Sequence, residues 1–470
     1  MMNIVDLVLE HTGDSRPAFI DEAGRATSYA EFTDLIRSLS TGLAATITET
    51  RQCLVVAHSE LLVCVALTLA GWRNGLRVAV VPPYIKPGEL AHVLEKCGPG
   101  IVVGQDADAS GRVAVRDLLG ASRSGGIAPL GEPWLETFTS GTTGKPKCVS
   151  RTVERLSRDV LTLAEVTGFG SADRITAMTS ALSTTSVLPA LVAGSALVQV
   201  GVRSGRDFWR QIVDRHVSVI SGTPYAYEIG AQHIPVAEEI RDVRLALCTS
   251  ARLRPRTARQ MIAKGVTVRN VMCSSEAGHI AYNDSADSDI LSRSVGRLLD
   301  GVEVVIREPV SGEPVRPGGT GLISVRSPYI ATRYRNDVER SAEVFRNGWV
   351  LSTDVGHIHD GFLFLEGRDD HKIHVGAAKV DPQEIEDALL RHPTVLDCVV
   401  VGEPHPRLGQ VIVARVKVAA TVSSKELSDH CAQMLSSIKV PRKVEFVDEI
   451  PRDFKGQPVR PKFVRFDGEE

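Results

Sequence analysis

Residues 139–147 read TSGTTGKPK, a run of hydroxyls, glycines and lysines whose chemistry suits the binding of a polyphosphate. Gly141 and Gly144 permit backbone angles closed to other residues, so consecutive N–H groups can converge on an anion. The hydroxyls can donate hydrogen bonds, and Lys145 and Lys147 supply positive charge. The order differs from that of the kinase P-loop, in which a glycine, four residues, a glycine, a lysine and a Ser or Thr follow one another. A solvated turn is the simpler interpretation, so phosphate binding is a hypothesis at this point.

The composition is that of an ordinary globular protein, with 470 residues, 43% hydrophobic and 24% charged, and a net charge of -3. A chain of this length usually forms two or more domains, and its charge gives no overall attraction to nucleic acid or membranes. The eight cysteines lack the spacing of a zinc site, which indicates reduced thiols. The longest apolar run, 61–72, is too short to cross a bilayer, and residues 1–10 do not resemble a signal peptide. We therefore expect a cytoplasmic protein.

Strand-like and helix-like segments alternate in the first part of the chain, which predicts a largely parallel sheet covered by helices. The predicted elements are a helix at 29–48, a strand at 53–57, a helix at 61–74 and a strand at 76–82, with the same rhythm at 207–221 and 258–272. From about residue 295, short strands punctuated by glycine predict a β-rich subdomain. A helix at 382–391 and strands at 395–402 and 411–418 follow. We expect an α/β fold, with a large N-terminal domain, its β-rich subdomain, and a small α+β C-terminal domain.

Five motifs occur in the order and spacing of the acyl-adenylate-forming (AMP-binding) superfamily, which includes acyl- and aryl-CoA synthetases, nonribosomal peptide synthetase adenylation domains and firefly-type luciferases. They are TSGTTGKPK at 139–147, SSEAG at 274–278, STD at 352–354, GRDD at 367–370 and KVDPQEIE at 379–386. The chain resembles this superfamily over nearly its whole length. The resemblance implies an enzyme that uses ATP and Mg²⁺ to convert a carboxylate to an acyl-AMP, releases pyrophosphate, and passes the acyl group to a nucleophile.

The resemblance assigns the phosphates and the metal to two of these motifs. Residues expected to hold the β and γ phosphates are Thr139, Ser140, Gly141, Thr142, Thr143, Gly144 and Lys147. Ser275 is expected to contact the α-phosphate. Glu276 matches the magnesium ligand of the superfamily, and a hard cation prefers such an oxygen.

The nucleoside is expected to contact residues of three further segments. Asp354 matches an aspartate that accepts hydrogen bonds from both ribose hydroxyls, because its two oxygens suit a vicinal diol. Arg368 is expected to reach the ribose or the phosphates. The adenine is expected at Ser250 and Ala251, against Met272, which stands where a tyrosine usually stacks and keeps an apolar plate there.

The resemblance also implies a domain boundary. Asp370 matches the hinge about which the C-terminal domain rotates between adenylation and acyl transfer. We therefore expect an AMP-binding domain at 1–367, with the β-rich subdomain at about 295–367. A hinge at 368–370 and a mobile lid domain at 371–470 complete the prediction.

At Gln457 the sequence departs from the superfamily pattern, in which a lysine directly after a glycine bridges the substrate carboxylate and the α-phosphate. Glutamine carries no charge, and losing one strong transition-state donor costs about 2.7–4 kcal/mol. Lys455 leaves the same face of an extended segment about 6.6 Å away. Three alternatives stay open: Lys455 replaces the missing lysine, adenylation is slow or uses another basic residue, or adenylation has been lost.

The acid pocket is expected to draw on three segments. Its candidate residues are Ser180, Leu182, Ser183, Thr223, Tyr225, Cys273, Ser274 and Gly278. No acidic residue occurs from 174 to 205, which disfavours an α-amino acid and favours a fatty, aryl or other small carboxylic acid. The chain contains no carrier domain, so CoA or the phosphopantetheine thiol of a carrier protein would be a separate acceptor. An amide-forming ligase, and a nucleotide- or acyl-binding relative without adenylation, stay as alternatives.

Overall fold

The computed structural model divides into two compact units, Met1–Val304 with Ser324–Leu351 and Val305–Ile323 with Ser352–Glu470. The structure describes residues 3–47, 53–83, 85–98, 100–106, 112–120, 131–139, 146–178, 182–231, 233–249, 253, 255–285, 287–309, 311–368, 373–375, 378–405, 409–452 and 458. The α/β class expected from the sequence is confirmed. The expected boundary at 368–370 stays a prediction.

One sheet of the first unit is parallel in its middle and antiparallel at both ends. Its strands follow the order β2 (Ala26–Ser28), β1 (Pro17–Ile20), β10 (Ala196–Gln199), β9 (Arg174–Ala177), β11 (Val219–Gly222), β12 (Leu245–Cys248), β13 (Val268–Ser274), β14 (Gly278–Asn283) and β15 (Ser294–Leu298). Pairing is parallel from β1 to β13 and antiparallel from β13 to β15. The turn between β13 and β14 carries the 274–278 motif.

A second sheet of this unit carries the predicted phosphate loop. Its strands follow the order β18 (Arg333–Tyr334), β8 (Lys147–Thr152), β7 (Trp134–Thr139), β4 (Arg77–Val80), β3 (Cys53–Ala57), β5 (Gly100–Gly104) and β6 (Val113–Ala114). Pairing is parallel from β7 to β6, whereas β8 is antiparallel to both neighbours. Strands β7 and β8 therefore form a hairpin, and residues 140–146 connect them.

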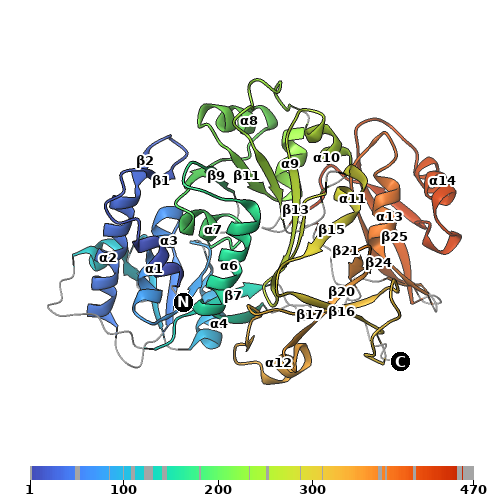
Figure 1. Cartoon of the computed structure of the whole chain (residues 1–470). Coiled ribbons are helices and arrows are strands. Elements are labelled where there is room, and N and C mark those ends of the chain that lie inside the picture. Colours follow the sequence, from blue (N-terminus) through green and yellow to red (C-terminus); the bar gives the residue numbers. More distant parts are fainter. Residues whose placement is uncertain are drawn as a thin grey trace. The chain divides into compact units, whose positions relative to one another are not determined.

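Helices of the first unit accompany these strands, and Figure 1 shows them in colours from blue (α1) to orange (α12). They are α1 (Ile4–Leu9), α2 (Tyr29–Thr46), α3 (Leu61–Arg73), α4 (Pro87–Cys97), α5 (Val115–Leu119), α6 (Val153–Thr167), α7 (Val187–Val192), α8 (Gly205–Asp214), α9 (Pro224–Ala231), α10 (Pro255–Ile262), α11 (Ser288–Arg293) and α12 (Val338–Val344). Apolar side chains of α2, α3, α6 and α7 form one core with strands of both sheets. Burying this apolar area is the main stabilising contribution.

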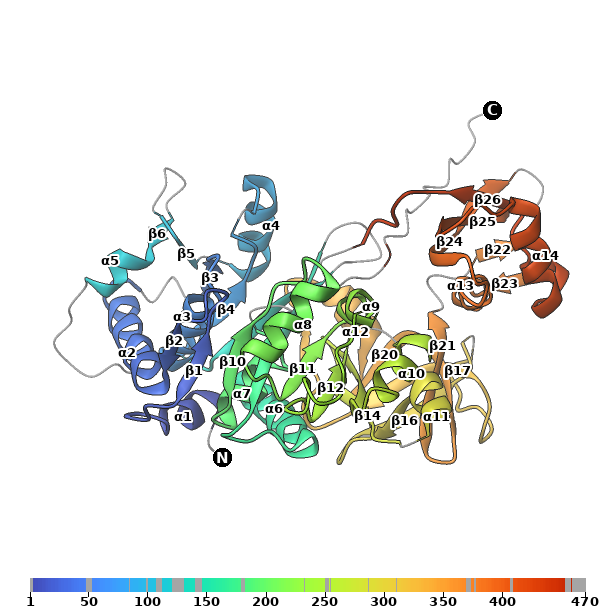
Figure 2. The ribbon, with the colours of Figure 1, turned by 90° about the horizontal axis from the view of Figure 1, so that it is seen from above.

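The second unit contains an antiparallel pair and a separate α+β sheet. Strands β16 (Glu303–Arg307), β17 (Gly321–Arg326) and β20 (Trp349–His359) run across the division between the units, β19 (Phe345–Arg346) pairs with β20, and β21 is Phe362–Arg368. The other sheet contains β22 (Ile373–Val375), β23 (Ala378–Val380), β24 (Val395–His405), β25 (Gly409–Val418) and β26 (Lys443–Phe446), with α13 (Pro382–Leu389), α14 (Ser424–Met434) and a 3₁₀ turn at Ser437–Lys439. Strands β24 and β25 form a long antiparallel pair, visible in Figure 2. Helices α13 and α14 share its core.

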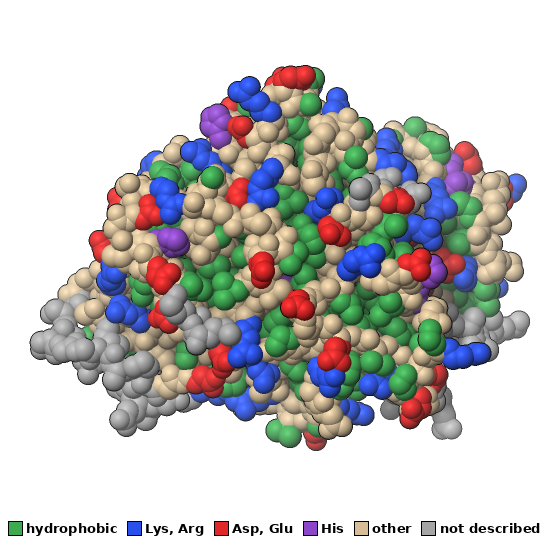
Figure 3. Space-filling model, in the orientation of Figure 1, with side chains coloured by type: hydrophobic (Ala, Val, Ile, Leu, Met, Phe, Trp, Pro, Cys, Tyr) green, Lys and Arg blue, Asp and Glu red, His purple; other side chains and the backbone are tan. Residues whose placement is uncertain are grey.

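The surface mixes charges of both signs. Figure 3 shows lysine and arginine side chains interspersed with aspartate and glutamate on the visible face, in keeping with the net charge of -3. Among the described residues, every helix is too short or too polar to traverse a bilayer.

Candidate active site

The β7–β8 hairpin brings the two ends of the predicted phosphate loop together. Thr139 and Lys147 are register partners across the two strands. The hydroxyl of Thr139 is buried and has no hydrogen-bond partner among the described residues. Because a buried polar group without a partner costs free energy, this hydroxyl fits a site that is completed by an anionic ligand. The loop residues Ser140, Gly141, Thr142, Thr143 and Gly144 lie outside the described residues.

Lys147 forms a three-membered cluster with Glu276 and Tyr334. Its Nζ lies 2.6 Å from Oε1 of Glu276 and 2.8 Å from the hydroxyl of Tyr334, and that hydroxyl lies 2.8 Å from the same carboxylate oxygen. The side chains of Lys147 and Glu276 are only 21% and 15% exposed, so water screens this ion pair weakly. The structure therefore joins the β7–β8 hairpin to the predicted metal ligand.

The electrostatics of the cluster keep Glu276 ionised. Burial by itself would raise the pKa of this carboxyl, but the charge of Lys147 and the hydrogen bonds from Lys147 and Tyr334 outweigh burial and lower the pKa. Conversely, burial and the neighbouring carboxylate raise the pKa of Tyr334 far above its usual value, so its hydroxyl stays protonated. The cluster thus contains one carboxylate, one ammonium and one neutral hydroxyl.

An ionised and largely buried carboxylate fits a hard divalent cation such as Mg²⁺. Among the described residues, no group of three or more His, Cys, Asp and Glu side chains is placed to hold a metal. Mg²⁺ usually takes one or two carboxylates and completes its shell with water and substrate phosphates. Glu276 would be the protein's ligand here.

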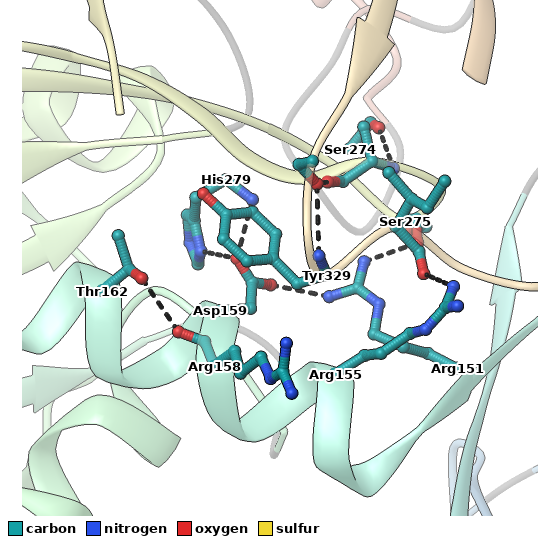
Figure 4. A network of polar contacts seen from close by, with 12 residues as sticks. Arg151, Arg155, Arg158, Asp159, Thr162, Ser274, Ser275, His279 and Tyr329 are labelled. Atoms are coloured by element: carbon teal, nitrogen blue, oxygen red, sulfur yellow. Dashed lines mark hydrogen bonds and ion pairs between the residues drawn. The ribbon is translucent and has the colours of Figure 1, made fainter. Parts of the chain in front are cut away.

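The backbone of the 274–278 turn is anchored from both sides. Nη2 of Arg151 donates to the carbonyl of Ser275 at 2.8 Å, and the N–H of Ala331 donates to the carbonyl of Glu276 at 2.6 Å. Figure 4 shows Arg151 reaching this turn from β8. With its carbonyls held, the turn can direct the Glu276 side chain to Lys147 without backbone freedom.

Four of the predicted acid-pocket residues lie on two segments, Leu182 and Ser183 on one and Ser274 and Gly278 on the other. A contact between Thr185 and His279 connects these segments. Leu182 is buried, and the hydroxyl of Ser183 accepts the N–H of Thr185 at 3.3 Å. The hydroxyl of Thr185 lies 3.3 Å from Nε2 of His279, which follows the turn that ends at Gly278. Ser274 begins that turn and Gly278 ends it, and these two residues are register partners.

The other pocket candidates are placed less completely. Cys273 is half-buried, and its Sγ lies 3.7 Å from the hydroxyl of Thr249. Thr223 follows β11, and its carbonyl accepts the N–H of Ala226 at 3.1 Å. Tyr225 lies on α9, but its side chain is outside the described residues, as is all of Ser180.

Some of the residues predicted to contact the nucleoside belong to the described part of the chain, and others do not. Met272 lies buried on β13. Asp354 and Arg368 are register partners on β20 and β21 of the second unit, which brings their backbones together. The remaining predicted residues, Ser250, Ala251, the hinge residue Asp370, Lys455 and Gln457, lie outside the described residues.

Two residues near the site, Tyr334 and Asp159, were not predicted from the sequence. Tyr334 lies in a segment with no recognised motif, and nothing in the sequence connected it with Glu276. Asp159 had a usable signal, because it occupies the apolar side of α6, where Leu156 and Leu163 are also buried. An acidic residue at such a position usually has a charged partner, and here the partner is Arg151 at 2.6 Å.

Comparison with known families gives two matches. The model of the family described as AMP-binding enzyme matches residues 8–335, and the model of the AMP-binding enzyme C-terminal domain matches residues 384–456. Together they cover most of the chain.

The chain is similar to curated proteins named as CoA ligases. It is 27% identical to the indoleacetate–CoA ligase of Aromatoleum aromaticum over 94% of this chain and 93% of that protein. It is 30% identical to the sulfoacetate–CoA ligase of Cupriavidus necator over 71% of this chain and 67% of that protein. Among solved structures, ATP-bound MatB from Rhodopseudomonas palustris is similar in fold, with a TM-score of 0.87, 24% identity and 97% of both chains covered.

Proposed function

The chain belongs to the AMP-binding enzyme family, and we propose that it is an ATP-dependent ligase that activates a carboxylic acid as an acyl-AMP and then forms a thioester. In the first step a carboxylate oxygen attacks the α-phosphorus of ATP, and the bond to pyrophosphate breaks. In the second step a thiol sulfur attacks the acyl carbon, and AMP leaves. The names of the relatives support CoA as the thiol; the phosphopantetheine of a carrier protein is the other acceptor of this chemistry.

The cluster of Lys147, Glu276 and Tyr334 carries this proposal. Joining a carboxylate to a phosphate brings two anions together, so the site must supply positive charge where negative charge develops. Lys147 and the hairpin loop bind the β and γ phosphates. Glu276 would hold Mg²⁺, which would supply positive charge to the phosphate oxygens. Lys147 and Tyr334 satisfy the buried carboxylate of Glu276.

The nucleoside and the α-phosphate are assigned to the residues that match the superfamily motifs. Ser275 contacts the α-phosphate, and Asp354 binds the ribose with Arg368 beside it. Ser250 and Ala251 border the adenine, which packs on Met272. The hinge at Asp370, with an AMP-binding domain before it and a lid domain after it, belongs to the same proposal.

The substrate is proposed to be a fatty, aryl or other small carboxylic acid. The two relatives are named for indoleacetate and sulfoacetate, neither of which is an α-amino acid. The absence of acidic residues from 174 to 205 supports the same class, because no carboxylate from that segment is available for an α-ammonium group.

ATP–pyrophosphate exchange tests the first step. Exchange is measured with indole-3-acetate, sulfoacetate, benzoate and octanoate, each with and without Mg²⁺, and an acid-dependent and Mg²⁺-dependent rate is expected. Glu276→Gln should reduce exchange about 10²-fold or more, because one strongly charged group at the reacting phosphates is lost. Glu154→Gln is the matched control, since Glu154 is an exposed carboxylate on α6. CoA is then added, and thioester formation is followed by mass spectrometry.

Two further variants test which group bridges the carboxylate and the α-phosphate. Loss of exchange in Lys455→Ala assigns this role to Lys455, and unchanged exchange removes it from the role. Should the native chain show no exchange with any acid while Gln457→Lys restores it, the proposed function fails for the native chain.

A further inference from the structure

His279 lies between two parts of the proposed site. It is fully buried on β14, directly after the turn that holds Glu276. Its Nδ1 lies 2.8 Å from Oδ1 of Asp159, and its backbone N–H donates to the same oxygen at 2.9 Å. On the other side of the ring, Nε2 lies 3.3 Å from the hydroxyl of Thr185. Figure 4 shows the ring of His279 beside Asp159.

Asp159 is held firmly enough to orient this ring. Its Oδ2 accepts Nη1 of Arg151 at 2.6 Å, and the carboxylate and the guanidinium are both buried. Burial would raise the pKa of Asp159, but His279 and Arg151 lower it further than burial raises it. The ionised carboxylate is an acceptor, so Nδ1 of His279 carries the proton that faces it. Nε2 is thereby directed at Thr185.

Gly278 makes this approach possible. Its φ is +75°, and a Cβ added there would lie 2.9 Å from both carboxylate oxygens of Asp159 and 2.7 Å from the ring of Tyr329. Only a residue without a side chain lets Asp159 come this close to the backbone of the turn. The end of the 274–278 turn is therefore shaped around Asp159 and His279.

On the other side, Thr185 belongs to a short segment whose hydroxyls are unusually placed. The hydroxyl of Ser183 accepts the N–H groups of Thr185 and Ser186 at 3.3 and 3.1 Å, which closes the turn before α7. The hydroxyl of Ser186 is fully buried and finds no hydrogen-bond partner among the described residues. Since buried polar groups are nearly always paired, this unpaired hydroxyl is a second sign that a polar ligand completes the segment.

We propose that His279, oriented by Asp159, is a positioning residue for the acid substrate. It fixes Thr185 and the turn at 183–186 at a set distance from the turn that carries Glu276. The acid carboxylate and the α-phosphate are thereby held in reacting geometry, which is where positioning contributes most to rate. This inference rests on the proposed function, because the turn at 183–186 borders the acid only if the protein binds one there.

Variants with side chains of different length test the two contacts of the imidazole separately. In His279→Asn the amide nitrogen takes the place of Nδ1 and keeps the contact with Asp159, but nothing reaches Thr185. In His279→Gln the longer side chain reaches Thr185 and loses the contact with Asp159. Thr185→Val removes only the hydroxyl. Thr167→Val is the matched control, since Thr167 is a buried threonine of α6 whose hydroxyl bonds the carbonyl of Leu163.

Pyrophosphate release is measured with whichever of the four acids gives the fastest exchange. We expect Thr185→Val and His279→Asn each to raise the KM for the acid about tenfold, the lower end for residues that orient a ligand-binding group. The KM for ATP should change less than twofold, and His279→Gln should affect the acid less than His279→Asn. The double variant should be no worse than either single variant, because both remove one contact. Thr167→Val should leave both constants unchanged.

Thermal unfolding with and without acid gives a second readout that does not need turnover. The acid should raise the midpoint of the native chain and of Thr167→Val more than that of Thr185→Val. If Thr185→Val exchanges at the native rate with an unchanged KM for the acid, the inference is refuted and the proposed function stands. The same holds if the increases in acid KM of the two single variants multiply in the double variant. Absence of exchange refutes the proposed function. The inference is then decided by the rise in thermal midpoint that the acid causes. It is refuted if Thr185→Val shows the same rise as the native chain, or if none of the four acids raises the midpoint of the native chain. If His279→Asn does not fold, Thr185→Val alone is compared with the native chain.

Discussion

Asp159→Asn should destabilise the first unit strongly, because it leaves the guanidinium of Arg151 buried without a counter-charge. The two side chains are 0% and 7% exposed, so little water can replace the lost partner. Breaking a buried ion pair by removing one partner costs about 3–5 kcal/mol. The upper half of that range is expected, because the same carboxylate also accepts the ring and backbone N–H groups of His279. An asparagine has only one acceptor oxygen for these three donors.

Tryptophan fluorescence during urea unfolding measures this loss of stability in the first unit. The chain has four tryptophans, Trp72, Trp134, Trp209 and Trp349, and all belong to the first unit. With a slope of about 3 kcal/mol per molar urea, a loss of about 4–5 kcal/mol lowers the midpoint by about 1.3–1.7 M. The slope itself should stay unchanged if only stability is affected.

Asp173→Asn is the matched control for this prediction. Asp173 also pairs with an arginine, Arg244, at 2.7 Å, but that arginine is 40% exposed and keeps contact with water when its partner is removed. Its carboxylate also accepts the hydroxyl of Ser218 and the N–H of Gly170, so the expected cost is about 1.5–3 kcal/mol, typical of hydrogen bonds to a charged group. Equal midpoint shifts in the two variants would mean that the charge of Arg151 is hydrated after all, and the reasoning from burial would be refuted.

Three further predictions concern the turn between β13 and β14. Tyr334→Phe removes a hydroxyl bonded to the carboxylate of Glu276 and should lower the unfolding free energy by about 1.5–3 kcal/mol, as hydrogen bonds to charged groups do; an unchanged urea midpoint would contradict it. The lowered pKa of Glu276 means that its ionised form stabilises the fold above the unfolded value of about 4.3, and that this contribution is lost as pH falls through the lowered pKa. The difference in urea midpoint between the native chain and Glu276→Gln should therefore shrink from pH 7 to pH 3, and a constant difference would argue against it. Gly278→Ala places a methyl group 2.7 Å from the ring of Tyr329 at a φ of +75° and should lower the thermal midpoint through a loss of about 2–5 kcal/mol, whereas a midpoint within error of the native one would show that the turn can relax.

Much of the fold could be predicted from local pattern. The strand expected at 53–57 is β3, the helix expected at 61–74 is α3, and the helix expected at 29–48 is α2. For α2 the reason is visible, because Ser28 and Glu31 form a capping box at its start. Boundaries were less accurate at the 274–278 motif, where β13 continues to Ser274 because it pairs with β14.

The candidate site was predictable only where a motif marked it. Lys147 and Glu276 were each recognised from their own motif, yet their 2.6 Å contact joins residues 129 positions apart. Tyr334 completes that cluster from a segment without a motif. Such partners depend on how two sheets pack, and no periodicity within a helix or strand carries that information.

The sequence by itself determined the alternation of strands and helices and the family, and it predicts phosphate binding at residues 139–147, because each depends on residue types at short spacing. Tertiary structure alone decided which side chains share a charge or a hydrogen bond. It placed Asp159 beside His279, 120 positions away, and aimed the imidazole at Thr185. The physical reason is that burial makes an unpaired charge or hydroxyl costly, so the partners are set by whichever groups the packed core brings within reach.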